Sequence, residues 1–275
     1  MLGRKATTNI LWFVFVLLAL FLAFTRLGPV GGILVMLFII GFMLYRRRGS
    51  LYHNAARRRF MEGDTESALA MMKKAVLADP GDSAVHASCG FMLLKIGRMT
   101  EAERMLTVAG NVAKTPEEKF NVKSTMSLLL WKKGRLEEAI AMLGEVMEKF
   151  TNTTTYATMG FFRIERGDVK DALAFNREAY AYNDKNPIIL DNYATALTMA
   201  GEQEEARKIF EDLMKLSPTF PDAYYNYGRF LETAGEDEKA ADMYRTAISK
   251  KFWHTSTVTR EEVEFRLGEL EAKNG

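Results

Sequence analysis

The sequence contains little of the chemistry that enzymes and metal proteins use. Its single cysteine, Cys89, excludes an internal disulfide, a cysteine-built zinc site and a Cys-x-x-Cys redox pair. Six prolines in 275 residues and a hydrophobic share of 48% exclude a proline-rich or disordered chain. The three histidines are far apart, and the sequence has no P-loop, G-x-G-x-x-G, G-x-S-x-G or H-E-x-x-H motif. We therefore expect no enzyme activity, no cofactor and no metal site.

Acidic residues are missing from the first part of the chain. The first 60 residues hold nine Lys and Arg and no Asp or Glu, whereas the whole chain has 37 basic and 35 acidic residues. The remaining residues therefore carry 28 basic against 35 acidic side chains, a net charge of −7. This asymmetry predicts a basic, apolar head joined to an acidic body. Because an acidic body repels phosphate, we expect no nucleic-acid partner.

The head has the composition of a membrane segment. Between residues 10 and 45 only Arg26 is charged. One continuous helix of that length would measure ~54 Å, far more than the ~30 Å hydrocarbon core of a bilayer. Residues 26–32 combine a proline with three glycines and favour a turn. The sequence therefore predicts a transmembrane helical hairpin with spans at about 8–25 and 29–45.

Two alternatives remain open for this segment: residues 1–24 could be a cleaved signal peptide, or the hairpin could be re-entrant. The basic flanks on both sides favour a cytoplasmic location for the body. The short hairpin anchor is typical of a bacterial inner-membrane protein with two spans. The arginines beyond the second span either set this topology only or also contact anionic lipid headgroups. These membrane-surface candidates are Arg46, Arg47, Arg48, Arg57, Arg58 and Arg59.

The body contains an internal repeat. A Gly-x4-Ala pattern recurs six times with spacings of 34, 37, 33, 34 and 34 residues, and its glycines are Gly63, Gly97, Gly134, Gly167, Gly201 and Gly235. Apolar or small residues follow most of the alanines four and seven positions later, which is a helical period. We interpret each unit as two antiparallel helices. The glycine ends the first helix in a left-handed conformation, and the alanine allows close packing of the second.

These residues resemble the tetratricopeptide repeat family, whose unit has 34 residues. Gly90, Gly160, Ala194 and Gly228 match the small position of the family's first helix. The resemblance covers residues 49–252 in six units that start near 49, 83, 120, 153, 187 and 221. It implies an all-α solenoid, a right-handed superhelix of helix pairs. Residues 1–48 form the anchor, and residues 253–275 contain a C-terminal capping helix.

In this family the first helix of each pair lines a concave groove, so the resemblance also implies a binding surface. We expect an apolar, aromatic half and a polar half, which would suit an amphipathic helix of a partner protein. The alternative is that Phe91, Leu128 and Phe161 only pack one unit against the next. The groove residues implied by the register are Phe91, Leu94, Lys95, Leu128, Trp131, Lys132, Phe161, Ile164, Asp191, Asn192, Thr195, Tyr225, Asn226 and Arg229.

The sequence thus favours a membrane-tethered scaffold or adaptor that binds a protein or peptide segment in this groove. The alternative function is an envelope-assembly or enzyme-regulating subunit that binds membrane partners through its hairpin. Both hypotheses assign binding rather than catalysis to the chain, because repeat solenoids present extended surfaces and no convergent polar groups.

Overall fold

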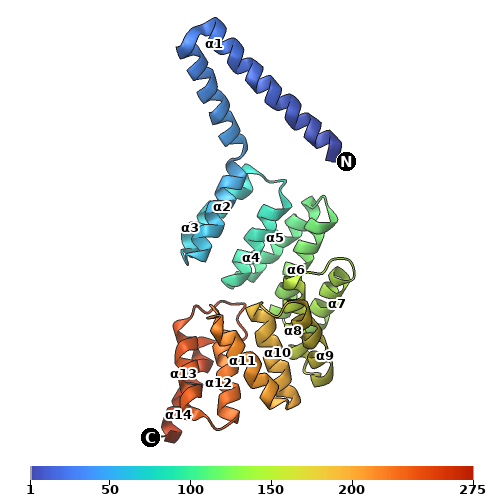
Figure 1. Cartoon of the computed structure of the whole chain (residues 1–275), viewed down its shortest axis with the longest axis vertical. Coiled ribbons are helices and arrows are strands. Elements are labelled where there is room, and N and C mark those ends of the chain that lie inside the picture. The colour runs from blue at the N-terminus through green and yellow to red at the C-terminus, as the bar shows by residue number, and fades with distance from the viewer. Residues whose placement is uncertain (1, 275) are drawn as a thin grey trace. The chain divides into compact units, whose positions relative to one another are not determined.

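The computed structural model describes the backbone of residues 2–274 and the side chains of residues 13–273. Every regular element in this described part is a helix, which confirms the all-α fold class (Figure 1). The helices belong to two compact units, Met1–Pro80 and Gly81–Gly275. The domain boundaries expected after residues 48 and 252 stay predictions.

Unit 1 begins with α1 (Leu2–Arg46), which is broken in its middle. Gly28 has a φ of 71° and a ψ of −180°, a left-handed conformation that favours glycine. Pro29 follows and cannot donate a main-chain hydrogen bond. Figure 1 shows α1 as two arms that diverge from a bend. The break lies inside the turn that the sequence predicts between residues 26 and 32.

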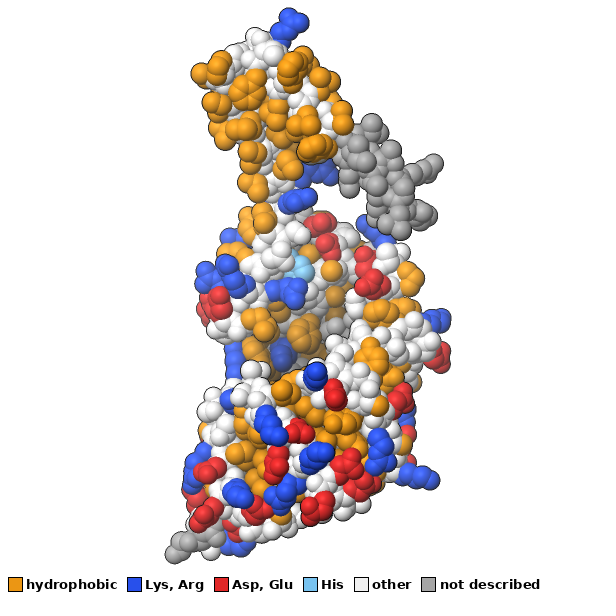
Figure 2. Space-filling view, viewed as in Figure 1, with side chains coloured by type: hydrophobic (Ala, Val, Ile, Leu, Met, Phe, Trp, Pro, Cys, Tyr) orange, Lys and Arg blue, Asp and Glu red, His pale blue; other side chains and the backbone are white. Residues whose placement is uncertain are grey.

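The side chains of α1 are apolar and mostly exposed. Figure 2 shows hydrophobic side chains over the part of α1 that is described there. Phe13 and Phe38, for example, are 60% and 74% exposed. One stretch, Phe13–Arg46, is long and apolar enough to cross a membrane. The basic flank of Arg4 and Lys5 lies outside the residues whose side chains are described.

The other helices of unit 1 are α2 (Arg48–Met61) and α3 (Thr65–Ala78), which pack against each other. Asp64 begins α3, because its Oδ1 accepts a hydrogen bond from the main-chain nitrogen of Ser67 at 3.1 Å. The pair buries the side chain of Phe60. These two helices are the first of six helix pairs in the described chain.

Unit 2 contains five more pairs and a terminal helix. The first helices of the pairs are α4, α6, α8, α10 and α12, and each packs against the helix that follows it. The bounds are α4 (Ser83–Lys95), α5 (Met99–Val112), α6 (Pro116–Lys132), α7 (Leu136–Met147), α8 (Thr153–Arg166), α9 (Val169–Tyr182), α10 (Pro187–Ala200), α11 (Gln203–Lys215), α12 (Pro221–Thr233), α13 (Asp237–Ser249) and α14 (Arg260–Asn274).

The repeat pattern has the structural meaning that the sequence predicts. The six repeat glycines all have positive φ, between 74° and 89°, and lie between the two helices of their pair. The alanine five positions after each glycine is fully buried, with 0% exposure in all six pairs. The small residues of the first helices face the second helices at close range. A Cβ added at Gly228, for example, would lie 2.5 Å from a ring carbon of Tyr244. Larger side chains would therefore separate the helices of a pair.

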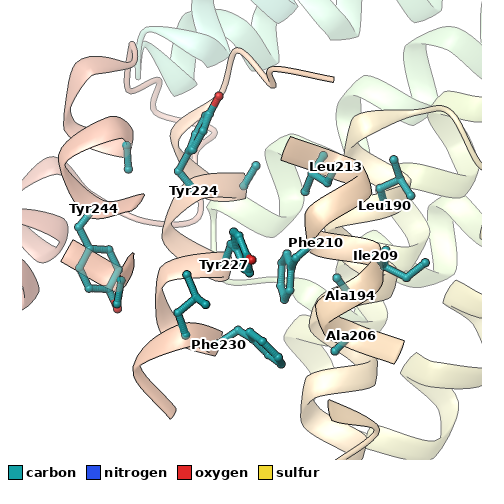
Figure 3. Packing of buried hydrophobic residues seen from close by; sticks show 14 of the residues in the cluster. Leu190, Ala194, Ala206, Ile209, Phe210, Leu213, Tyr224, Tyr227, Phe230 and Tyr244 are labelled. Atoms are coloured by element: carbon teal, nitrogen blue, oxygen red, sulfur yellow. The ribbon is translucent and has the colours of Figure 1, made fainter. Parts of the chain in front are cut away.

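The largest core cluster of unit 2 lies among its last pairs (Figure 3). Phe210 on α11 stacks on Tyr227 of α12 with ring centroids 5.1 Å apart, and it also contacts the ring of Phe230 at 5.5 Å. Ile209 and Leu213 of α11 belong to the same cluster. Aromatic packing between successive pairs therefore fixes this end of the array.

Capping boxes precede two of the helices. Thr115 and Glu118 form one before α6, which begins at Pro116, whereas the sequence interpretation starts the third unit near residue 120. Thr259 and Glu262 form the hydrogen bonds of another before α14. In α14, Val263 and Leu270 join the core cluster, whereas Phe265 is 68% exposed. That α14 acts as a cap stays a prediction.

Candidate functional site

The predicted groove residues all lie on first helices of unit 2. We call this surface the first-helix face and define it by α4, α6, α8, α10 and α12. The predicted residues come from every one of these helices: Phe91, Leu94 and Lys95 from α4; Leu128, Trp131 and Lys132 from α6; Phe161 and Ile164 from α8; Asp191, Asn192 and Thr195 from α10; and Tyr225, Asn226 and Arg229 from α12.

Burial divides these residues into three groups. Phe91 and Arg229 are exposed, and most of the others are half-buried. Leu94, Asp191 and Asn192 are buried, which corrects the expectation that their side chains are open to a partner. Leu94 is part of the interior because its side chain has no exposed surface. Asn192 donates its side-chain amide to the carbonyl of Ala157 at 2.7 Å, so it ties α10 to α8.

The aromatic half of the face is built around one edge-to-face ring pair. The rings of Trp131 and Phe161 have centroids 4.6 Å apart and planes inclined by 81°. The indole nitrogen of Trp131 donates to Glu165 at 3.3 Å, and the Lys132 ammonium lies 4.1 Å from the indole centroid. Trp131, Phe161 and Leu128 also pack against the buried cluster of α6, α7 and α8. These side chains therefore contribute to the core and keep one partly exposed edge.

The polar half is built around two buried acids. Asn226 donates its amide to both carboxylate oxygens of Asp191 at 3.1 Å. Asp191 and Asp222 are only 5% and 8% exposed. Burial raises the pKa of Asp191 to about 7; the Asn226 hydrogen bond opposes this shift, and the negative charge of Asp222 adds to it. A carboxyl with this pKa changes its charge near neutral pH.

A segment between the last two helices lies on the first-helix face. This segment, which we call the C-terminal loop, is Lys250–Thr259 between α13 and α14 (Figure 1). The His254 amide donates to the Lys95 carbonyl at 2.9 Å, and the Lys132 ammonium donates to the Ser256 carbonyl at 2.8 Å. The amide and hydroxyl of Thr257 both donate to Asp222 Oδ1, at 2.5 and 2.6 Å. Three first helices thus hold the loop.

Local sequence explains why these contact residues point to one place. Lys95 and Lys132 are the last residues of α4 and α6, each two positions before a repeat glycine that ends the helix. Asp222 is in the first turn of α12, directly after Pro221. Burial lowers the pKa of Lys95, an effect that Asp222 opposes and Lys251 strengthens. Burial also lowers the pKa of Lys132, and there Asp222 and Glu165 oppose it. Opposite charges therefore compensate each other beneath the loop.

Family models for the tetratricopeptide repeat match residues 59–119 and residues 194–253. The chain contains tetratricopeptide repeats. Comparison with curated proteins gives no sequence match. Proteins of the tetratricopeptide repeat family act as protein-binding scaffolds, and they are generally non-catalytic.

Solved structures share the tetratricopeptide repeat fold at low sequence identity. The structure of pilF from Pseudomonas aeruginosa is 16% identical with a TM-score of 0.57 and covers 82% of this chain and 99% of its own. The Cut9–Hcn1 hetero-tetramer contains a chain that is 14% identical with a TM-score of 0.65; the match covers 81% of this chain and 42% of that one. Human IFIT1, solved as a dimer with m7Gppp-AAAA, is 18% identical with a TM-score of 0.60 and covers 75% and 50%. At these identities the likeness shows the fold alone.

Sequence reasoning on the repeat register missed the C-terminal loop and Asp222. The register assigns function to fixed positions of each unit, whereas the loop follows the sixth unit and Asp222 is not one of those positions. One signal was present: Phe252 and Trp253 stand together in a short connection between two helices. Aromatic side chains in such a connection require a surface to cover them.

The described residues offer no convergent chemistry of another kind. Among them, no group of three or more His, Cys, Asp or Glu is placed to hold a metal ion. Cys89 is buried in α4, where a cysteine behaves as a small hydrophobic side chain.

The six membrane-surface arginines of unit 1 differ in their surroundings. Arg48 stacks on Tyr45, with its guanidinium carbon 3.8 Å from the ring centroid, and donates to the Tyr45 carbonyl at 2.8 Å. Arg58 and Arg59 pair with acids of their own unit, at 3.9 Å from Glu62 and 3.4 Å from Asp64. The exposed members of the set are Arg46, Arg47, Arg57, Arg58 and Arg59.

Proposed function

We propose that this protein is a membrane-tethered scaffold that captures a protein segment on the first-helix face of unit 2, on the cytoplasmic side of a membrane. The single observation that carries the proposal is the occupied face itself. A non-helical polypeptide segment already lies there, held by groups from α4, α6 and α12. Main-chain and side-chain donors of a peptide thus find partners on this surface.

The exposed apolar surface of α1 supports the tether. Soluble proteins rarely expose large contiguous apolar patches, whereas lipid tails cover such surfaces favourably. A helix arm from residue 29 to Arg46 would measure ~27 Å, close to the ~30 Å of a hydrocarbon core. The break at Gly28 and Pro29 supports a reversal of the chain between two arms. The excess of arginine after the second arm favours the cytoplasmic side.

The arginines support a contact between unit 1 and anionic lipid. Each basic residue close to a membrane surface contributes roughly 1 kcal/mol of attraction to anionic headgroups. Arg46 and Arg47 directly follow the apolar segment and are exposed, and Arg57 is exposed on α2. Arg58 and Arg59 form ion pairs with acids of unit 1 on the exposed helix surface. Such surface pairs contribute little to stability.

A photo-crosslinking amino acid tests the proposal in the full chain within native membranes. Positions Phe161 and Tyr225 sample the first-helix face, and the exposed Glu137 on α7 is the matched control. We expect a protein adduct from the first two positions and none from Glu137. Equal adducts from all three positions, or none from the face, would contradict capture at this surface.

The second candidate is a membrane subunit that binds its partners through α1, and the exposure of the α1 side chains favours it. The same experiment distinguishes it, with the crosslinker at Phe38, which is 74% exposed. Adducts confined to Phe38 would favour the hairpin as the binding element.

A further inference from the structure

The C-terminal loop is clamped at three points that are distant in sequence. The contact between Lys132 and Ser256 joins residues separated by 124 positions, and the contact of Thr257 with Asp222 joins residues separated by 35. The third contact, from His254 to Lys95, reaches the first pair of unit 2. A simple connection between α13 and α14 does not require contacts with α4 and α6.

The part of the loop that makes these contacts is a tight turn. The amide of Ser256 donates to the carbonyl of Trp253 at 2.9 Å, and the Ser256 hydroxyl accepts from the Trp253 amide at 3.2 Å. This is the hydrogen bond of a β-turn over residues 253–256. The turn therefore holds its shape with its own groups and leaves other main-chain groups for the first-helix face.

The chemistry of the contacts divides into a general part and a selective part. The His254 amide and the Ser256 carbonyl are main-chain groups, which almost any residue supplies. The Thr257 hydroxyl is a side-chain donor, and it meets the acid Asp222 at 2.6 Å. A Ser or Thr at this position is therefore the feature that the face can select.

The acids beneath the turn strengthen this selection. Asp222 is 8% exposed, so it requires hydrogen-bond donors when water is excluded. The loop supplies two, an amide and a hydroxyl. Lys95 and Lys132 balance the charge of these acids. A negatively charged group in place of the Thr257 hydroxyl would face the Asp222 carboxylate directly and would lack the proton that Asp222 accepts.

We propose that the first-helix face recognises a Ser- or Thr-bearing β-turn of a partner protein, and that residues 253–257 are its internal ligand. This inference rests on the proposed function, because it specifies the segment that the scaffold captures. An amide of the partner turn donates to the main-chain carbonyl of Lys95, and a carbonyl of the turn accepts from the Lys132 ammonium. A second amide and a hydroxyl of the turn donate to the Asp222 carboxylate. The partner turn binds only when the internal turn has left the first-helix face.

The internal turn competes strongly because it is tethered to the face. A short flexible tether gives an effective concentration in the millimolar range. A peptide added in solution must therefore overcome this competition, and weakening the internal turn should strengthen its binding. This gain of binding from a lost contact is a result that a purely structural loop would not produce.

The test uses the full chain in detergent micelles and a fluorescein-labelled peptide with the sequence of residues 250–259, followed by fluorescence polarisation. The loosened chain carries His254→Pro and Thr257→Val. Proline is well tolerated at the second position of a β-turn, so the first change removes the amide donor and keeps the turn. Valine keeps the shape of threonine without the hydroxyl. The matched control is Thr255→Ala, which changes the same turn and none of the three contacts.

We expect the peptide to bind the loosened chain at least about tenfold more tightly than the wild-type or the Thr255→Ala chain. A peptide with Thr257→Val should bind the loosened chain about tenfold more weakly, the effect of losing one hydrogen bond to a charged group. A peptide phosphorylated at Thr257 should not bind. Adding Asp222→Ala to the loosened chain should abolish binding of the unmodified peptide.

A second measurement needs only the wild-type chain. In the wild-type chain, saturating peptide should accelerate amide hydrogen exchange in residues 250–259, because the internal turn is displaced. Equal affinity of the loosened and wild-type chains, or equal affinity of the two peptides, would overturn the inference. If the peptide does not bind the loosened chain while crosslinks still form at Phe161 and Tyr225, the proposed recognition of a turn is wrong. The proposal that the first-helix face captures a protein segment then still stands.

Discussion

The side-chain amide of Asn176 donates a hydrogen bond to the main-chain carbonyl of Gly160 at 3.1 Å and another to the carbonyl of Ala172 at 2.9 Å. In the other five pairs the position equivalent to Asn176 holds Met, Leu, Phe or Tyr. A polar side chain therefore replaces apolar packing at the centre of the α8–α9 pair. It is tolerated because both of its N–H donors find carbonyls.

Gly160→Leu should destabilise this pair specifically. A Cβ at residue 160 would meet Asn176 Oδ1 and lie 3.3 Å from Asn192 Nδ2, so α8 must move away from its neighbours. Overpacking of this kind costs about 1–3 kcal/mol. We expect faster hydrogen exchange across residues 153–182, because solenoid pairs respond locally.

The matched control is Gly144→Leu on α7, where an added Cβ meets nothing within 4 Å. Glycine is a poor helix former, so this change should stabilise α7 by up to about 1 kcal/mol. Slower exchange in residues 153–182 of the Gly160→Leu protein would show that the assigned helix contact is wrong.

Asp191 should give the stability of unit 2 a characteristic pH dependence. Its pKa rises from 3.8 to about 7 on folding, so between these values the folded chain holds a proton that the unfolded chain has released. The contribution of Asp191 to the free energy of unfolding therefore falls as pH rises from about 4 to about 7. The fall should be about 2–4 kcal/mol and level off above that range.

Asp191→Asn removes the titration and should flatten this part of the profile, whereas Asp184→Asn at an exposed position should not. Chemical denaturation of the full chain in detergent at pH 4.5, 6 and 7.5 provides the comparison. Parallel profiles of the wild type and the Asp191→Asn protein would contradict the assignment.

Trp131 and Phe161 should be energetically coupled. Edge-to-face ring pairs contribute about 0.5–1.5 kcal/mol beyond the area that they bury. A double-mutant cycle with Trp131→Ala and Phe161→Ala measures this coupling as the difference between the double change and the two single changes. A coupling energy near zero would mean that the two rings act separately.

The arms of α1 should place their break on the far side of the membrane from unit 2. In a Cys89→Ala background, a cysteine at residue 30 should react with an impermeant maleimide in intact cells, and a cysteine at residue 270 should not. The buried native cysteine is removed so that it contributes no label. Labelling at residue 270 would place the body outside and refute the topology.

The repeat made most of the fold predictable from sequence, because each glycine and alanine has one local role that does not depend on distant residues. The break of α1 at Gly28 was predictable for the same reason. Leu94 and Asn192 were assigned to the groove by register alone, but their burial depends on packing between pairs. The role of Asp222 depends on a loop 35 residues later in the chain, and no local pattern encodes a contact of that range.

The three contacts of the C-terminal loop also determine when the first-helix face closes during synthesis. A chain folds from its N-terminus as it emerges, so α4, α6 and α12 are complete before residues 253–257 leave the ribosome. The bond between Lys132 and Ser256 cannot form until residue 256 has been made, long after α6 is complete. Every newly synthesised molecule therefore presents the first-helix face uncovered before the internal turn reaches it.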